Sequence, residues 1–158
     1  MGLKLTLNEI SVEFVRFLDT NYPRVLAEGS SSKVELSIFG TPAIDGPAYI
    51  SRHIWACNAI YTHEQRDLLE ALFAEFHYRR RNQQPCDILI YDTTVTLKER
   101  SPRTRALVPD TAERAIGSSH VAYYAQFKGA FTEGPKFSKA GQHDFVQFSL
   151  TETVLVEA

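Results

Sequence analysis

The stretch "YTHEQRDLLEALFAEFHYRRR", residues 61–81, has the pattern of an amphipathic helix. Thr62 and Gln65 are spaced as in a capping box, where each side chain bonds the backbone N–H of the other residue. One apolar stripe recurs at helical spacing and consists of Leu68, Leu69, Leu72, Phe73 and Phe76. Arg79, Arg80 and Arg81 complement the carbonyl end of the helix dipole. The pattern therefore predicts a helix over about residues 62–81.

Segments on both sides of this helix alternate apolar and polar residues, which is typical of half-buried strands. Strands are expected over residues 3–9, 10–18, 33–40, 49–61, 86–92, 93–99, 120–131 and 144–158. The last of these is long for a strand, since five or six residues are usual. Its apolar residues Val146, Phe148, Leu150, Val154 and Val156 are expected to share one face.

Four segments lack a period and are rich in glycine, proline or polar residues, so they are expected to be loops. They are residues 19–32, 41–48, 100–119 and 132–143. The third is too long for an ordinary hairpin turn, and long loops in compact domains are usually functional or disordered.

The order of strands, one helix and more strands predicts a mainly β (α+β) chain. The expected architecture is a β-sandwich or partly open barrel of two packed antiparallel sheets, with the flanking helix covering one open side. In that position the helix would also shield a sheet edge. The 158 residues fit a single domain, residues 1–158, and 44% of them are hydrophobic, enough to form a core.

Composition argues against several classes of function. The formal net charge is −2, whereas a dedicated nucleic-acid-binding domain is usually strongly basic. No apolar run approaches the roughly 20 residues that span a bilayer, so no membrane association is expected. Cys57 and Cys86 lie in strand-like runs away from ligand-spaced partners, and are expected to be small buried residues in a reducing compartment.

The sequence contains few patterns that indicate catalysis or the binding of a cofactor. It contains no nucleophile elbow, zinc-protease helix, phosphate-binding loop or dinucleotide fingerprint. The five histidines, His53, His63, His77, His120 and His143, form no pair at metal-ligand spacing, so neither a metal nor another cofactor is expected. Two carboxylate pairs, Asp92 with Glu99 and Asp110 with Glu113, are candidates for acid–base work, but Asp92 reads better as a turn residue. We therefore expect no enzyme.

Two arginine groups are candidates for an interface. Arg79, Arg80 and Arg81 are either a solvated helix end or a contact for an acidic partner surface. Arg100, Arg103 and Arg105 surround Ser101 and Thr104, and they suit either a phosphate contact or salt bridges to a neighbouring subunit.

A longer pattern consists of "GPAYISRHIWACNAIY", "THEQRDLLEALFAEFHYRRR", "CDILIYD" and "ERSPRTRAL", and the resemblance that it carries covers about residues 48–107. It resembles minor tail and distal tail proteins of tailed bacteriophages, the tail-tube-like modules that join the tail tube to the baseplate hub. The resemblance lies in the architecture and contains no diagnostic motif. No extended hairpin of the tube type is apparent, so tube, distal ring and hub adaptor stay open.

The resemblance implies a structural role in a virion tail, assembled in the bacterial host cytoplasm. Members of this group form homo-oligomeric rings, commonly hexamers or trimers, that stack on tail-tube and baseplate-hub proteins. DNA would pass through the lumen without specific binding. The long terminal strand and the excursions 100–119 and 129–143 would then be inter-subunit arms. Cyclic closure would satisfy strand edges left open in the isolated subunit.

Two other functions remain open on the residues alone. One is a monomeric β-sandwich that binds a small molecule or carbohydrate, and the other is a hydrolase whose catalytic residues are dispersed along the chain. Stoichiometry, the neighbouring proteins and the partner of the arginine-rich loop do not follow from the sequence.

Overall fold

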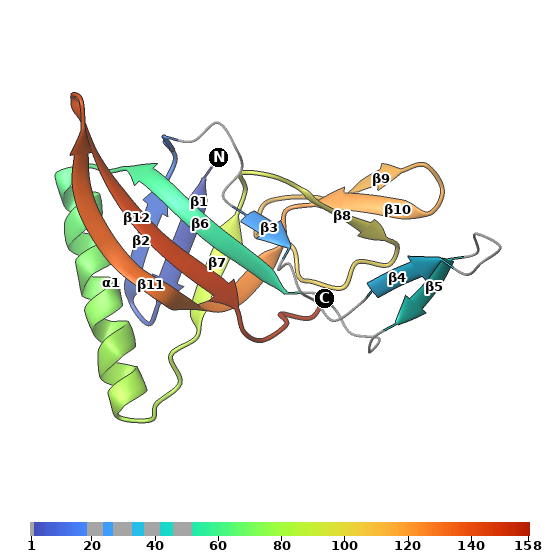
Figure 1. Cartoon of the computed structure of the whole chain (residues 1–158), viewed down its shortest axis with the longest axis horizontal. Helices are drawn as coiled ribbons and strands as arrows, with labels where there is room; N and C mark the ends of the chain where they lie inside the picture. The colour runs from blue at the N-terminus through green and yellow to red at the C-terminus, as the bar shows by residue number, and fades with distance from the viewer. Residues whose placement is uncertain (1, 19–23, 27–32, 37–41, 46–51) are drawn as a thin grey trace.

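The structure is a computed structural model that describes residues 2–18, 24–26, 33–36, 42–45 and 52–158. One helix and twelve strands lie in these residues (Figure 1). They are, in order, β1 (Leu3–Leu7), β2 (Ile10–Phe14), β3 (Arg24–Leu26), β4 (Lys33–Leu36), β5 (Pro42–Asp45), β6 (His53–Ile60), α1 (His63–Arg81), β7 (Ile88–Asp92), β8 (Leu97–Arg100), β9 (Arg114–Ile116), β10 (His120–Tyr123), β11 (Gln126–Ala140) and β12 (His143–Glu152).

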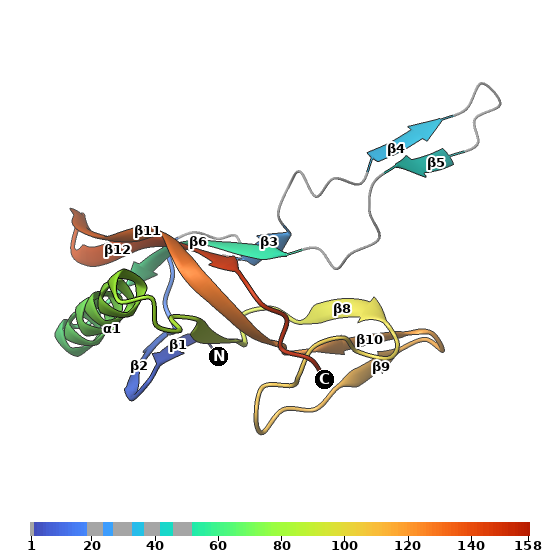
Figure 2. The same ribbon diagram turned by 90° about the horizontal axis from the view of Figure 1, so that it is seen from below.

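The strands form antiparallel sheets, which confirms the expected mainly β fold with one helix. Seven strands make the main sheet in the order β2-β1-β7-β11-β12-β6-β3, and β8-β10-β9 make a second sheet. β4 and β5 pair with each other. Figure 2 shows β6, β11 and β12 in one layer, with β1, β2 and the helix beneath it. No helix of the described residues is both long and apolar enough to cross a bilayer.

The main sheet curls far enough for its two ends to meet. The chain leaves β2 and pairs with β6 through an isolated bridge between Phe17 and Ala59. Two backbone hydrogen bonds support this bridge: Leu18 N–H donates to the Asn58 carbonyl at 2.8 Å, and Ile60 N–H donates to the Arg16 carbonyl at 2.9 Å. Residues 10–18 thus join β1 at one end and β6 at the other, which closes one part of the sheet into a barrel.

The helix covers the part of the barrel that stays open, as the sequence predicted. It contacts β1, β2 and β11 and buries Leu69, Leu72 and Phe76 against them. Its capping box is formed: the Thr62 hydroxyl accepts from Gln65 N–H at 3.3 Å, and Thr62 N–H donates to the Gln65 amide oxygen at 2.8 Å. The Gln65 side chain also donates to the Glu13 carbonyl at 2.7 Å, which ties the helix start to β2.

Several expected loops contain strands. The segment 132–143 belongs to a long hairpin in which β11 runs to Ala140 and β12 begins at His143. Gly134 and Pro135 suggested a loop, but β11 accommodates them with two bulges in its pairing with β12, beyond the point where β7 ends. β3 lies inside the expected loop 19–32, β5 inside 41–48 and β9 inside 100–119. The rest of the expected loops 19–32 and 41–48 lies outside the described residues. So do residues 37–40 of the expected strand 33–40 and residues 49–51 of the expected strand 49–61.

Two other expectations need correction. The expected strand 120–131 is divided between two sheets, because β10 ends at Tyr123 and β11 starts at Gln126. The expected terminal strand ends at Glu152, and Val154 is 52% exposed instead of sharing the buried face. Residues 156–158 form a short separate pairing, with Ala106 N–H donating to the Val156 carbonyl at 2.9 Å.

Candidate functional site

A cluster of buried charged residues lies where the main sheet meets the segment after β8. It consists of Arg24, His53, Asp92, Arg105 and Glu152, each at most 8% exposed. Burying a charge is costly unless it is paired and hydrogen-bonded. The cluster is therefore the place in the described structure where a function, if chemical, would be expected first.

The first half of the cluster is built around Asp92, which is fully buried at the end of β7. Its carboxylate accepts from the Arg24 guanidinium at 3.1 Å and from the Trp55 indole N–H at 3.2 Å. The other oxygen accepts from Thr94 N–H at 2.9 Å and from the Thr94 hydroxyl. The sequence-based interpretation of Asp92 as a turn residue is thus correct, but incomplete, because the same carboxylate also holds a buried arginine.

The second half is built around Glu152 at the end of β12. Arg105 donates two hydrogen bonds to its carboxylate, one from Nε at 3.0 Å and one from a terminal nitrogen at 2.9 Å. His53 adds its backbone N–H at 3.1 Å. The His53 ring Nδ1 lies 3.5 Å from the carboxylate and makes no regular hydrogen bond. This two-point pairing is the geometry for which arginine is suited.

Phe127 joins the two halves. The Arg24 guanidinium lies 5.1 Å from the centre of its ring and the Arg105 guanidinium 5.4 Å, both within cation–π range. Trp55 and His53 meet the same ring edge-on at 5.0 and 5.2 Å. Two positive groups thus share one buried aromatic ring, and two carboxylates balance their charge.

Glu99 and Tyr123 extend the network into the second sheet. The Tyr123 hydroxyl donates to Glu99 at 2.7 Å and accepts from Arg105 N–H at 3.1 Å. Thr104 donates to the same carboxylate through its hydroxyl at 2.8 Å and through its backbone N–H. These contacts fix the segment that carries Arg105 against β8 and β10.

The electrostatics follow from burial and pairing. Burial alone would raise the pKa of Glu152, but the hydrogen bonds from His53 and Arg105 outweigh it and leave that pKa below its usual value. Burial lowers the pKa of Arg24, although Asp92 opposes the shift. Burial and the hydrogen bond to Glu99 raise the pKa of Tyr123 to about 12. Pairing with its neighbours therefore favours the ionised form of Glu152 in spite of its burial.

This arrangement is suited to holding the fold together. Both arginines and both carboxylates of the cluster are paired with each other. Burial, with a smaller contribution from Asp92, raises the pKa of the Cys57 thiol, so that thiol is not a nucleophile. Among the described residues, no three histidine, cysteine or acidic side chains are placed to bind one metal ion.

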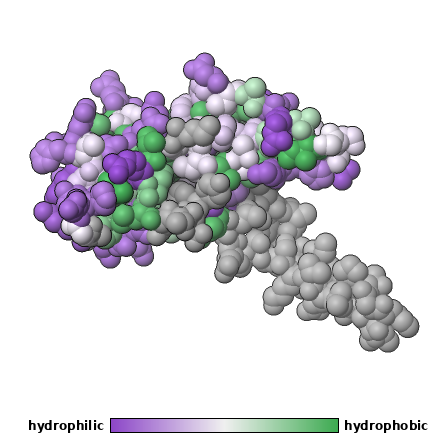
Figure 3. Space-filling model, turned by 90° about the horizontal axis from the view of Figure 1, so that it is seen from above, coloured by the Kyte–Doolittle hydropathy of each residue, from purple (hydrophilic) through white to green (hydrophobic). Residues whose placement is uncertain are grey.

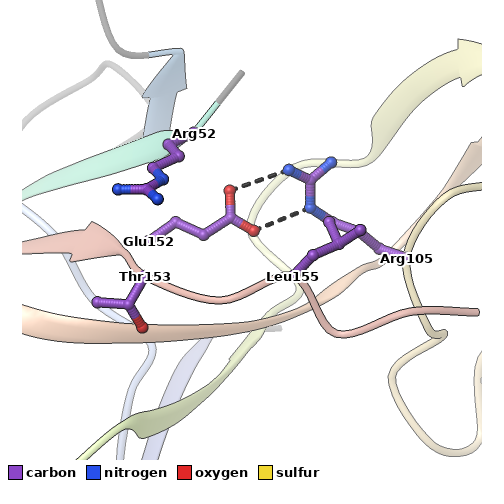
Figure 4. Close-up of a pocket in the computed structure, with 5 residues that line it drawn as sticks. All are labelled: Arg52, Arg105, Glu152, Thr153 and Leu155. Atoms are coloured by element: carbon purple, nitrogen blue, oxygen red, sulfur yellow. Dashed lines mark hydrogen bonds and ion pairs between the residues drawn. The ribbon is translucent and has the colours of Figure 1, made fainter. Parts of the chain in front are cut away.

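A small cavity opens beside the second half of the cluster. It has a volume of about 180 Å³ and is lined by Arg52, Arg105, Glu152, Thr153 and Leu155. Figure 4 shows the Glu152 carboxylate between the two arginines, with Arg105 bonded to it and Arg52 approaching from the other side. Pockets that enclose small molecules usually measure about 300–1,000 Å³. This cavity is below that range.

The arginines predicted for an interface separate into exposed and buried ones. Arg80, Arg81 and Arg100 are exposed, and Arg79 is half-buried beside Glu75 at 2.7 Å. Arg103 is half-buried and bonds Glu113 at 3.1 Å. Arg105 departs from the expectation, because it is 2% exposed and its charge is satisfied within the chain. The structure does not bring the helix-end arginines and the loop arginines into one described contact.

The remaining candidates from the sequence also stay apart. The pair Asp92 and Glu99 is divided between the two parts of the network, each bonded to its own partners. Asp110 and Glu113 are exposed. Cys57 is buried as expected, whereas Cys86 is only half-buried, and both are free thiols.

Sequence reasoning missed Arg24, His53 and Glu152 as members of a site. Two of them could have been found from the alternation of their strands. In β6 every second residue is buried, and His53 begins the row that continues with Trp55, Cys57 and Ala59. In β12 Glu152 ends the corresponding row of Val146, Phe148 and Leu150. A charged or titratable residue in the inward position of a half-buried strand predicts a buried partner.

Comparison with known proteins adds no further assignment: no protein-family model, curated protein or solved structure matches this chain.

Proposed function

We propose that the chain is a structural subunit of a phage tail or tail tip, of the distal-tail or tube-to-baseplate adaptor kind, that assembles as a ring around a lumen. The observation that supports this function best is the long hairpin of β11 and β12. β7 pairs with β11 only as far as Gly129. Beyond that point, residues 130–140 pair on one side with β12 and have no strand on the other side among the described residues.

An unpaired strand edge is a place where another chain can add a strand. The edge of β11 is selective, since it carries Pro135, Lys136 and two bulges, which hinder pairing with an arbitrary strand. A neighbour must match this irregular register in order to pair with it. Such matching favours one defined contact that repeats around a ring over open-ended aggregation.

The absence of reactive chemistry in the described residues is compatible with a structural role. The buried charges are paired, and the described cavities of about 150–210 Å³ give little support to a monomeric small-molecule or carbohydrate-binding module. The coloured part of the face drawn in Figure 3 is mainly hydrophilic, with apolar residues gathered in smaller patches between polar ones. With a net charge of −2, the subunit would let DNA pass without holding its phosphates.

A shortened hairpin tests the proposal. Removing Lys139, Ala140, His143 and Asp144 deletes two cross-strand pairs and keeps the turn residues Gly141 and Gln142. We expect the natural chain to give annular particles in negative-stain electron microscopy and a multimeric mass in light scattering. The shortened chain should form no annular particles while its unfolding midpoint changes little, because the removed pairs lie at an exposed tip.

Two results would count against the ring. One is a natural chain that remains monomeric and forms no annular particles, alone or with tail-tube and hub proteins. The other is a shortened chain that still forms the same particles, which would exclude the tip of the hairpin as part of the contact.

A further inference from the structure

The outer face of α1 carries a regular row of exposed residues that the fold does not use. Glu64, Asp67, Ala71, Ala74, Tyr78 and Arg81 follow one another at spacings of three, four, three, four and three, and all six are exposed. This is the heptad spacing of a helix–helix seam. The buried residues Leu69, Leu72 and Phe76 lie on the opposite side of the helix. Figures 1 and 2 both show α1 at the margin of the molecule, with its outer side not covered by any labelled element.

The row is complementary to itself when reversed. If a second helix lies antiparallel with Ala71 opposite Ala74, then Glu64 falls opposite Arg81 and Asp67 falls opposite Tyr78. The two alanines at the centre allow the helix backbones to approach closely. The acidic residues of each helix then meet the arginine and the tyrosine hydroxyl of the other. A twofold axis makes every one of these contacts twice.

Three charges of this row lack partners among the described residues, as Arg80 does, whereas two ion pairs join other charges of the helix. Arg66 pairs with Glu70 at 3.1 Å and Arg79 with Glu75 at 2.7 Å, one turn apart. Glu64, Asp67 and Arg81 have no ion pair or side-chain hydrogen bond with any described residue. Tyr78 is 52% exposed. The residues of the row are thus available to a partner, while Arg66, Glu70, Glu75 and Arg79 on the same helix are already paired.

We infer that this row, the α1 seam, is a contact between two copies of the chain, packed antiparallel about a twofold axis. The helix has 19 residues and is about 28 Å long, so the seam is smaller than the roughly 800 Å² per partner of a standard interface. The contact is accordingly weak in solution and is strengthened where copies are held together. It is separate from the ring contact, which uses strand edges and joins unlike surfaces of neighbouring copies.

A simpler role exists for the same charges, because acidic residues near a helix start and basic residues near its end stabilise the helix dipole. The two roles give opposite results when both charges are reversed. Glu64→Arg with Arg81→Glu restores the pairing between copies, since each reversed residue again meets its opposite. The same double reversal is the least favourable combination for the dipole of the single helix.

The experiment compares four chains: the natural one, Glu64→Arg, Arg81→Glu and the double variant. Sedimentation equilibrium over about 10 µM to 1 mM protein, at low and at high salt, measures the dimer dissociation constant. Each single reversal should weaken dimerisation about tenfold or more, because it replaces two attractive contacts by two repulsive ones. The dissociation constant of the double variant should return to within about threefold of that of the natural chain. Its thermal unfolding midpoint should nevertheless be the lowest of the four, because both reversed charges oppose the helix dipole.

Lys98→Glu is the control, an exposed charge away from the helix that should leave the dissociation constant unchanged. A double variant that associates no better than the single variants would overturn the α1 seam, as would a natural chain that stays monomeric over the whole range. The behaviour of the double variant does not affect the ring proposal, which is tested by the hairpin-shortened chain, whereas a natural chain that stays monomeric counts against both proposals. Conversely, loss of rings in that chain leaves dimerisation through the seam intact.

Discussion

At the scale of single residues, the molecule depends on buried charges that are tolerated only because each has its partner. Asp92 and Glu152 are almost inaccessible, and each is bonded to an arginine and to at least one further donor. Removing one partner leaves the other charge buried and uncompensated, which is usually more harmful than losing the whole pair. The cluster should therefore be sensitive to single substitutions and tolerant of matched double ones.

Arg105→Ala should lower the free energy of unfolding by about 3–5 kcal/mol, because the Glu152 carboxylate would keep only the His53 N–H. The double variant Arg105→Met with Glu152→Leu should recover most of this loss. The exposed Arg100→Ala is the control and should change stability by less than about 0.5 kcal/mol. Urea unfolding followed by the fluorescence of Trp55 measures all three. Equal effects at positions 100 and 105 would show that Arg105 is not a buried partner.

Acid should weaken the protein partly through Glu152. Its pKa is lower in the folded chain than the value of about 4.3 expected in the unfolded chain. The stability that this carboxylate contributes is therefore complete above the unfolded pKa, and it is lost as the pH falls through the folded pKa. Glu152→Gln should be less stable than the natural chain at neutral pH, and this difference should shrink on acidification. A difference that is constant from pH 7 to pH 3 would contradict the pairing.

At the scale of elements, the sequence predicted an element correctly where all of its signals lie within its own residues. The helix was predictable because its cap, its apolar stripe and its terminal charges all lie within 20 consecutive residues. β11 was not predicted beyond Phe131, since glycine and proline usually end a strand, and the hairpin tolerates Gly134 and Pro135 only because β7 no longer runs alongside. β3 was missed for a similar reason: it has three residues, and its strand character comes from pairing with the distant β6.

The helix start gives a prediction at this scale, because Gln65 has two functions. Its oxygen completes the cap, and its nitrogen bonds the Glu13 carbonyl of β2. Thr62→Ala should cost about 1 kcal/mol through loss of the cap, and Thr62→Ser should cost little. Gln65→Glu keeps the cap acceptor but removes the bond to β2, and Gln65→Ala removes both. In thermal unfolding, Gln65→Ala should be the most destabilising of the four substitutions. If Gln65→Ala destabilises the protein less than Thr62→Ala does, the bond from Gln65 to β2 contributes nothing to stability.

At the scale of the whole molecule, the decisive contact is the closure of the barrel by residues 16–18. The sequence predicted a strand there, but the alternation of a single segment does not tell which two strands it will join. Likewise, the partners within the charge cluster lie 47 to 99 residues apart, as for Arg105 with Glu152 and His53 with Glu152. Such pairings are properties of the assembled fold, which is why the site was the part that sequence reasoning missed.

Leu18→Pro tests the closure. Proline has no N–H, so the bond from residue 18 to the Asn58 carbonyl at 2.8 Å is lost. We expect a loss of about 3 kcal/mol in unfolding free energy and faster hydrogen exchange of the amides of residues 58–60. Leu18→Ala is the matched control and should cost much less, since Leu18 is 37% exposed. Equal stability of the two variants would mean that the barrel does not depend on this bond.

The place of β12 in the main sheet has a consequence for biosynthesis. β6 is translated about ninety residues before β12, the strand that pairs with it along most of its length, and β12 also completes the hairpin with β11. Ribosomes add about 5–20 residues per second, so each emerging chain carries an incomplete sheet for several seconds. Prematurely terminated products that lack β12 should therefore accumulate as insoluble material or as chaperone clients, even when every earlier strand is present.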